Sequence, residues 1–240
     1  MAGAVIHNWA RTHSCRPQRV ARPENEAALR TLVREAAAAG SKIKVIGARH
    51  SWSDIAMSEG VLVSLDAMQE LLAVDLEAGR VRVQAGVRLH RLVELLAAQG
   101  LALAIVGSVL EQSIAGVMAT GTHGSSLVHG NIPSHVVGLR MVTAGGEILE
   151  LGEGDPRLRG ARVGLGALGV ITEVRVRVEP LFRLRETTQI LSFDEAVASV
   201  DAIARSAEYV KLWWLPHTDA VMVFRCERTR EPGRLSPLAT

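Results

Sequence analysis

The sequence predicts an α+β fold in which a mixed α/β body over residues 1–180 is followed by a smaller unit over residues 181–228. Apolar residues recur with helical spacing in two segments before residue 100, which favours two amphipathic helices. Short runs with alternating or β-branched residues lie between and after these segments, as is typical of strands. The pattern changes at Pro180, which ends the last alternating run of the body. Residues 229–240 have no periodicity and are expected to form an irregular tail.

The first predicted helix lies between Pro23 and Gly40, since proline favours the first turn of a helix and glycine commonly ends one. Its apolar face consists of Leu29, Leu32, Val33 and Ala36. The second predicted helix lies between Arg88 and Gln99 and is stopped by Gly100. Its apolar face consists of Leu89, Leu92, Val93 and Leu96. Both helices are therefore expected to pack one side against the core.

The strands of the body are predicted from short apolar or alternating runs. They are expected at residues 42–46, 61–65, 80–85, 137–143, 147–151 and 170–178. Ala144, Gly145 and Gly146 separate the fourth and fifth strands, which predicts a hairpin. Strict alternation in the last strand places Arg175 and Arg177 on its solvated side.

The smaller unit has fewer predicted elements. We expect a hinge at residues 180–185, a helix at 192–207 and strands at 209–215 and 220–225. One helix and two strands are few for an independently stable domain. Trp213 and Trp214 are expected in the core, because large aromatic side chains are usually buried.

Composition excludes several functions. Hydrophobic residues make up 48% of the chain, which is typical of a packed globular protein. The formal net charge is only +2, and no basic run with interleaved aromatic residues is present, so nucleic acid is not an expected partner. Cys15 and Cys226 lie far apart and lack neighbouring ligands, which favours free thiols in a reducing, cytoplasmic location. We expect neither a signal peptide nor a transmembrane helix, because residues 1–16 lack an apolar segment and no apolar run reaches eighteen residues.

Residues 107–124, GSVLEQSIAGVMATGTHG, are the most informative segment of the chain. They are too rich in glycine for a plain helix and too apolar for a solvated loop. Small residues allow backbone N–H groups to approach a large anionic group, and neighbouring hydroxyls can donate to its oxygens. A dinucleotide pyrophosphate has these properties. A second loop of this kind, GARHS at residues 47–51, lies about sixty residues upstream.

These blocks resemble a known family. Residues 47–54 and 107–124 are similar to the two flavin loops of the vanillyl-alcohol-oxidase superfamily, the FAD-linked oxidases with a PCMH-type FAD-binding domain. Residues 161–174 and 213–219 are similar to further segments of the aldonolactone oxidases, which act on L-gulonolactone or D-arabinono-1,4-lactone, and of the alditol oxidases. All four blocks occur in the family's order, and the resemblance extends from Asn8 to Arg230.

The resemblance implies a fold and a domain division. Residues 1–180 would form a PCMH-type FAD-binding domain of two α/β subdomains, and residues 181–228 would begin a substrate cap domain. The relatives continue further, through a larger cap and a His-Trp-Gly-Lys ending that has no counterpart here. The cap is therefore expected to be incomplete and the chain to be truncated at its C-terminus.

The resemblance also assigns site residues. His50 would be covalently bonded to FAD, within a loop formed by Gly47, Ala48, Arg49, His50 and Ser51. Further flavin contacts would come from Ser108, Ser113, Gly116, Thr120, Gly121, Thr122 and His123, and from the backbone near Val170 and Ile171. Gly107 would lie near the reactive edge of the flavin and leave a path for dioxygen. The alternative for His50 is a loop histidine that hydrogen-bonds to the backbone.

Three other sites are rejected on spacing. Ser51, His50 and Asp54 are too close in sequence for a hydrolase triad and lack a nucleophile elbow. His123, His129 and His135 recur every six residues, which fits neither a helix face nor a strand face, so no metal site is expected. Residues 164–169 match Gly-x-Gly-x-x-Gly, but they precede a strand instead of opening a helix after one.

The family implies FAD-dependent oxidation of a sugar lactone or polyol, with hydride transfer to flavin N5 and reoxidation by dioxygen to give hydrogen peroxide. A gulono-, galactono- or arabinono-1,4-lactone is favoured by residues 213–219. Two alternatives stay open: a flavin-binding fragment with little turnover because the rest of the cap is missing, and a dehydrogenase that uses another acceptor. Some relatives are peripheral membrane enzymes, so membrane association stays open as well.

Overall fold

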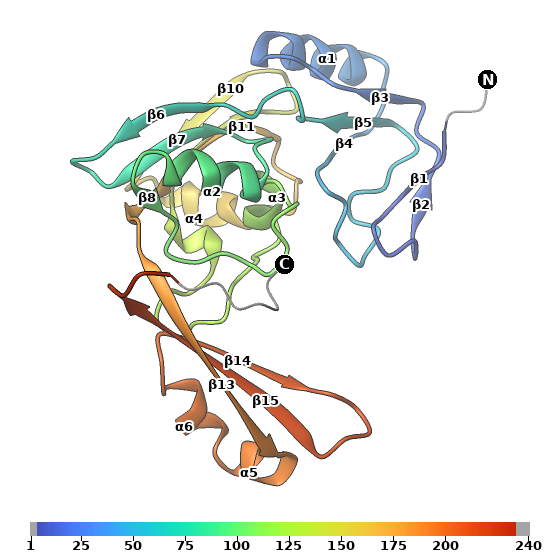
Figure 1. Cartoon of the computed structure of the whole chain (residues 1–240). Coiled ribbons are helices and arrows are strands. Elements are labelled where there is room, and N and C mark those ends of the chain that lie inside the picture. The colour runs from blue at the N-terminus through green and yellow to red at the C-terminus, as the bar shows by residue number, and fades with distance from the viewer. Residues whose placement is uncertain (1–3, 234–240) are drawn as a thin grey trace.

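The computed structural model describes residues 4–233, and its elements form three groups (Figure 1). The first group contains helix α1 and a small sheet. The second contains a larger sheet with helices α2, α3 and α4 on one face. The third, a sheet with helices α5 and α6, extends away from the other two. Within the described residues, no helix is long and apolar enough to cross a membrane.

The first group is a three-stranded parallel sheet covered by one helix. The strands lie in the order β3 (Arg19–Ala21), β5 (Val61–Ser64) and β4 (Ile43–Ile46). Helix α1 (Glu26–Ala38) connects β3 to β4, as parallel strands require a crossover. Its buried residues are Leu29, Leu32, Val33 and Ala36, which confirms the predicted face. A hairpin of β1 (Ile6–His7) and β2 (Ser14–Cys15) precedes the sheet.

The second group contains an antiparallel five-stranded sheet. Its order is β10 (Ile148–Leu151), β9 (Val136–Val142), β11 (Val170–Arg177), β7 (Arg80–Gln84) and β6 (Leu71–Asp75). Helices α2 (Leu89–Ala97), α3 (Ile114–Ala119) and α4 (Pro156–Arg162) cover one face. The largest apolar core of the protein lies between these helices and the sheet. A 3-10 turn, η1 (Ile132–His135), leads into β9.

The predictions for this group are confirmed in outline. Strands β7, β9, β10 and β11 occur where alternation predicted them, and β9 pairs with β10 in the expected hairpin. Leu89, Leu92 and Leu96 are buried in α2, but Val93 is 37% exposed and was wrongly placed in the core. Strand β6 and helices α3 and α4 were not predicted.

The third group was predicted in part: its two later strands occur where they were expected, but one long strand was missed and the helix differs. Its antiparallel sheet has the order β13 (Arg183–Ser192), β15 (Ala220–Thr229) and β14 (Tyr209–Trp214). A long strand therefore occupies part of the hinge predicted at residues 180–185, and residues 178–182 connect this strand to β11. There β12 (Glu179–Pro180) pairs with β8 (Leu101–Ala102). The predicted single helix is two, α5 (Phe193–Ala198) and α6 (Val200–Ala204), and they join at Ser199.

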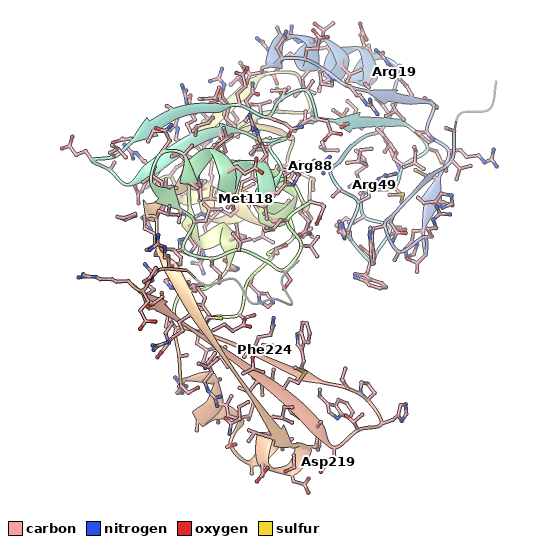
Figure 2. All side chains as sticks on the ribbon, in the orientation of Figure 1. Arg19, Arg49, Arg88, Met118, Asp219 and Phe224 are labelled. Atoms are coloured by element: carbon pink, nitrogen blue, oxygen red, sulfur yellow. The ribbon has the colours of Figure 1, made fainter. Side chains whose placement is uncertain are left out.

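The two tryptophans of β14 are not core residues, contrary to the prediction. Trp213 is 52% exposed and contacts Phe224 edge-on, on the sheet face opposite α5 and α6 (Figure 2). Trp214 is 50% exposed and lies against Phe193 of α5. Strand β14 is at an edge of a small sheet, so the described residues do not provide enough surface to cover either indole.

A polar cluster joins the third group to the second. The Nε2 atom of His129 lies 2.7 Å from a carboxylate oxygen of Glu208, which also accepts a 2.9 Å hydrogen bond from Arg228. Arg228 donates two further bonds, of 2.7 and 3.1 Å, to Glu179. Burial raises the pKa of Tyr209, whose ring stacks on His129, to about 12. The cluster holds the beginning of the predicted cap against the body.

Candidate functional site

A large pocket lies where loops from distant parts of the chain meet. Together with the space open to solvent, it encloses about 1000 Å³. The loops after β4, β5 and β7 line it, together with α3 and the segment before β11. In Figure 2 Arg49 marks the loop after β4, and Arg88 and Met118 mark the group of elements that faces it. The pocket thus includes parts of both predicted flavin loops.

The first loop follows β4 directly and comes very close to α3. A Cβ atom at Gly47 would lie only 2.8 Å from the Oγ atom of Ser113, so this approach requires glycine. The left-handed backbone of this loop is at Arg49, with φ 61°. His50 and Ser51 follow, both half-buried in the pocket wall.

The second loop contains a short helix, although its glycine content argued against one. Ser113 caps α3, because its hydroxyl accepts a 3.3 Å hydrogen bond from the N–H of Gly116. The hydroxyl of Thr120 donates a 3.0 Å bond to the carbonyl of Gly116. Gly121, with φ +71°, ends the helix in a left-handed conformation. Local capping at both ends thus allows six helical residues to form here.

The structure brings together nine of the predicted site residues. The pocket is lined by Gly47, Ala48, Arg49, His50, Ser51, Ser113, Gly116, Thr120 and Ile171. The other predicted residues lie outside its lining: Gly107, Ser108, Gly121, Thr122, His123 and Val170. The flavin contacts of all these residues stay predictions.

Several pocket residues were not predicted from the sequence. The polar or glycine residues among them are Lys44, Asp66, Gly86, Gln112, Gly166 and Gly169. Gly169 has φ +148°, and a Cβ there would lie 2.5 Å from the carbonyl oxygen of Val142, so only glycine fits. Gly166 and Gly169 belong to the glycine-rich run that precedes β11 and could be seen in the sequence. Asp66 could be placed in the pocket only once the fold was known. Asp66 forms an ion pair with Arg88, which also donates a 3.1 Å bond to the carbonyl of Glu111.

The chemistry of the lining suits a dinucleotide. Lys44 and Arg49 are basic, whereas the one carboxylate in the lining, Asp66, is paired with Arg88. The hydroxyl of Ser113 accepts from the N–H of Gly116 and keeps its own proton for a ligand oxygen, whereas the hydroxyl of Thr120 already donates to the carbonyl of Gly116. Because Gly47 has no side chain, the two loops can lie in close contact at this point. These residues fit the FAD that the sequence resemblance implies.

Comparisons with known proteins agree with this assignment. The family model described as an FAD binding domain matches residues 17–152, more than half of the chain. The family model described as D-arabinono-1,4-lactone oxidase matches residues 174–239. The first match contains the loops after β4 and β5 and helix α3, and the second begins within β11.

Curated relatives are about a third identical to the chain over the aligned residues. L-gulono-1,4-lactone dehydrogenase of Mycobacterium tuberculosis is 36% identical over 97% of the chain and 54% of the relative. D-arabinono-1,4-lactone oxidase of Kluyveromyces lactis is 36% identical over 95% of the chain and 45% of the relative. L-gulonolactone oxidase of Bos taurus is 36% identical over 96% of the chain and 53% of the relative. The chain thus spans about half the length of these relatives.

Solved structures show the fold. Cholesterol oxidase from Brevibacterium sterolicum superimposes with a TM-score of 0.86 over 95% of the chain and 48% of that protein. A solvent-stable cholesterol oxidase superimposes with a TM-score of 0.87 over 97% of the chain and 49% of that protein. At 18% and 20% identity, these likenesses concern the architecture alone.

Proposed function

We propose, from the premise that this chain belongs to the family of FAD-binding aldonolactone oxidases and dehydrogenases, that the protein oxidises a sugar-derived lactone with FAD as its cofactor. The observation that carries the proposal is the pocket in which the loop after β4 meets α3. Gulono-, galactono- and arabinono-1,4-lactones are the proposed substrates, and the names of the relatives contain the gulono- and arabinono- compounds. We further propose residues 1–180 as the FAD-binding domain and residues 181–228 as the beginning of a substrate cap.

The residues of the pocket would bind and orient the cofactor. The hydroxyl of Ser113 accepts from the N–H of Gly116, and its own proton is a donor suited to a phosphate oxygen. Lys44 and Arg49 add positive charge. When bound, FAD accepts a hydride at N5 from the substrate and passes the electrons to an acceptor. The protein's own contribution is orientation, which supplies a large part of an enzymatic rate.

His50 is the proposed point of covalent attachment. It lies in the pocket wall and on the same loop as Gly47, whose contact with Ser113 fixes the distance of the loop from α3. The half-buried imidazole is accessible from the pocket. A loop held in place by such a contact positions a nucleophilic side chain more precisely than a free loop does.

The electron acceptor separates two candidate functions. Oxidases use dioxygen and produce hydrogen peroxide, and we propose this acceptor because Gly107 would leave space for it. A Cβ at Gly107 would lie 3.3 Å from a methyl group of Thr122, so alanine would fill the space that glycine leaves open. The second candidate is a dehydrogenase with another acceptor, since the relative from Mycobacterium tuberculosis bears that name. A cytoplasmic location is proposed from the free cysteines, Cys15 and Cys226.

Acid precipitation of the purified chain tests the cofactor and its attachment. We expect flavin absorbance in the protein and yellow colour that stays with the precipitate. His50→Ala should bind FAD but release it into the supernatant. A colourless chain that does not take up added FAD would contradict the proposed function, and colour released from the wild type would contradict attachment at His50. With lactones as substrates, peroxide production measured against cytochrome c reduction distinguishes the two acceptors.

A further inference from the structure

The loop that contains His50 is braced by the N-terminal hairpin, a feature that no part of the proposed function uses. Asn8 follows β1, is only 3% exposed and donates a 3.1 Å hydrogen bond from its amide to the carbonyl of Ser51. The same amide donates to the hydroxyl of Thr12, and its oxygen accepts from the N–H of His13. Asn8 therefore holds both the turn of the hairpin and the end of the histidine loop.

Trp9, the next residue, contacts the histidine loop in two ways. Its backbone N–H donates a 2.8 Å hydrogen bond to the carbonyl of Arg49. Its indole stacks on the imidazole of His50, with ring centroids 5.1 Å apart and an angle of 23° between the planes. Trp52 contacts the same indole edge-on at 6.4 Å. The stack on His50 and the perpendicular contact with Trp52 are thus two separate interactions of the same indole.

The placement of the indole separates its role from that of the pocket residues. His50 lines the pocket, but Trp9 does not, and its side chain is 63% exposed. A tryptophan left so exposed gains little from burial, so its flat contact with His50 is the main interaction of the ring. The imidazole thus lines the pocket and stacks on a ring that lies outside the pocket lining.

We propose that Trp9 is a positioning residue for flavin attachment: its indole holds the imidazole of His50 in the orientation that presents a ring nitrogen to the pocket. The proposal rests on the proposed attachment at His50. Stacking confines the imidazole to a plane near that of the indole, whereas a histidine on a loop otherwise samples several rotamers. Trp9 acts only through His50.

The attachment reaction shows why orientation matters. A bond forms between an imidazole nitrogen and the 8α-carbon of the flavin, while the imidazole and the 8α-methyl group each lose a proton. The two electrons left on the flavin are then taken up by dioxygen, which becomes hydrogen peroxide. A nitrogen held in line with the carbon removes the need to find that geometry by rotation, so the attachment rate should depend on the stack.

The test compares Trp9→Ala and Trp9→Phe with Trp52→Ala, a matched removal of an exposed indole that has no stack with His50. Each flavin-free chain is mixed with FAD in air, and acid-precipitable flavin fluorescence is followed with time. Loss of a stacked aromatic pair should slow attachment about two- to tenfold in Trp9→Ala. Trp9→Phe should restore most of the rate, and Trp52→Ala should match the wild type. FAD affinity before attachment, measured by fluorescence quenching, should not change in any variant.

A measurement without flavin keeps the proposal independent of turnover. In the flavin-free chain, the ring protons of His50 should show an upfield ring-current shift in NMR spectra that is lost in Trp9→Ala and kept in Trp52→Ala. An equal attachment rate in Trp9→Ala and wild type would overturn the proposal, as would a rate in Trp9→Phe as low as in Trp9→Ala. If the wild type forms no covalent bond while the ring-current shift is present, the failure lies in the proposed attachment at His50, and the positioning role falls with it.

Discussion

Replacement of Gly47 by alanine tests the contact on which the pocket depends. The new Cβ atom would lie 2.8 Å from the Oγ of Ser113, against an ordinary contact distance of about 3.4 Å, a deficit of about 0.6 Å. The hydroxyl cannot simply turn away, because it accepts the capping bond from Gly116. We therefore expect either loss of the cap or displacement of the histidine loop from α3.

The size of the effect follows from these two routes. Loss of a serine cap costs about 1 kcal/mol, whereas alanine in place of glycine stabilises by about 0.4–1 kcal/mol through the unfolded chain where its conformation is allowed. Gly47→Ala should thus lower the free energy of unfolding by up to about 0.6 kcal/mol in the wild type. In a Ser113→Ala chain, which has neither hydroxyl nor cap, the same change should be neutral or stabilising.

Urea unfolding followed by tryptophan fluorescence measures both effects in a double-mutant cycle. Gly160→Ala is the control, because a Cβ at that helical position meets no atom within 4 Å, and it should not destabilise the chain. FAD binding should weaken in Gly47→Ala and recover in part in the double variant. Equal effects of Gly47→Ala in the two backgrounds would refute the assigned contact between the loops.

Two further predictions concern ion pairs outside the pocket. Burial works to raise the pKa of Glu26, but hydrogen bonds from Arg140 and Thr172 outweigh it and hold the pKa below its usual value of 4.5. The ionised carboxylate of Glu26 therefore stabilises the folded protein fully at pH values above 4.5. This stabilisation is lost as the pH falls through the lower pKa that Glu26 has in the folded state. Glu26→Gln should lower the free energy of unfolding by about 1–3 kcal/mol at pH 7 and by progressively less in acid. If urea unfolding shows a loss that does not depend on pH, the proposed link between the charge of Glu26 and stability is excluded. Arg228→Ala should weaken the attachment of the third group to the second, because Arg228 binds both Glu208 and Glu179. Amide hydrogen exchange in β15 should become about fivefold faster, which corresponds to about 1 kcal/mol. Unchanged exchange would show that the polar cluster around Glu208 does not join the two groups.

Part of the fold followed from the sequence because the relevant signals are local. The apolar face of α1 and the alternation of β11 each repeat with the period of their element, and both were predicted at nearly the observed bounds. Strand β13 gave no such signal, because eight of its ten residues are exposed and its pairing with β15 defines it. Helix α3 was missed because capping by Ser113 and termination at Gly121 outweigh the low helix propensity of its glycine.

By itself, the sequence determined the family and the cofactor class and marked the residues of two loops that would hold the cofactor, because the resemblance rests on motifs of consecutive residues. Only the tertiary structure decided which of those residues share a pocket, since Gly47 and Ser113 are 66 positions apart and their contact depends on how two sheets are packed. It also placed Asp66 in the pocket and Trp9 behind His50. Long-range contacts of this kind leave no periodic signal in the chain, because they depend on the relative position of separate elements.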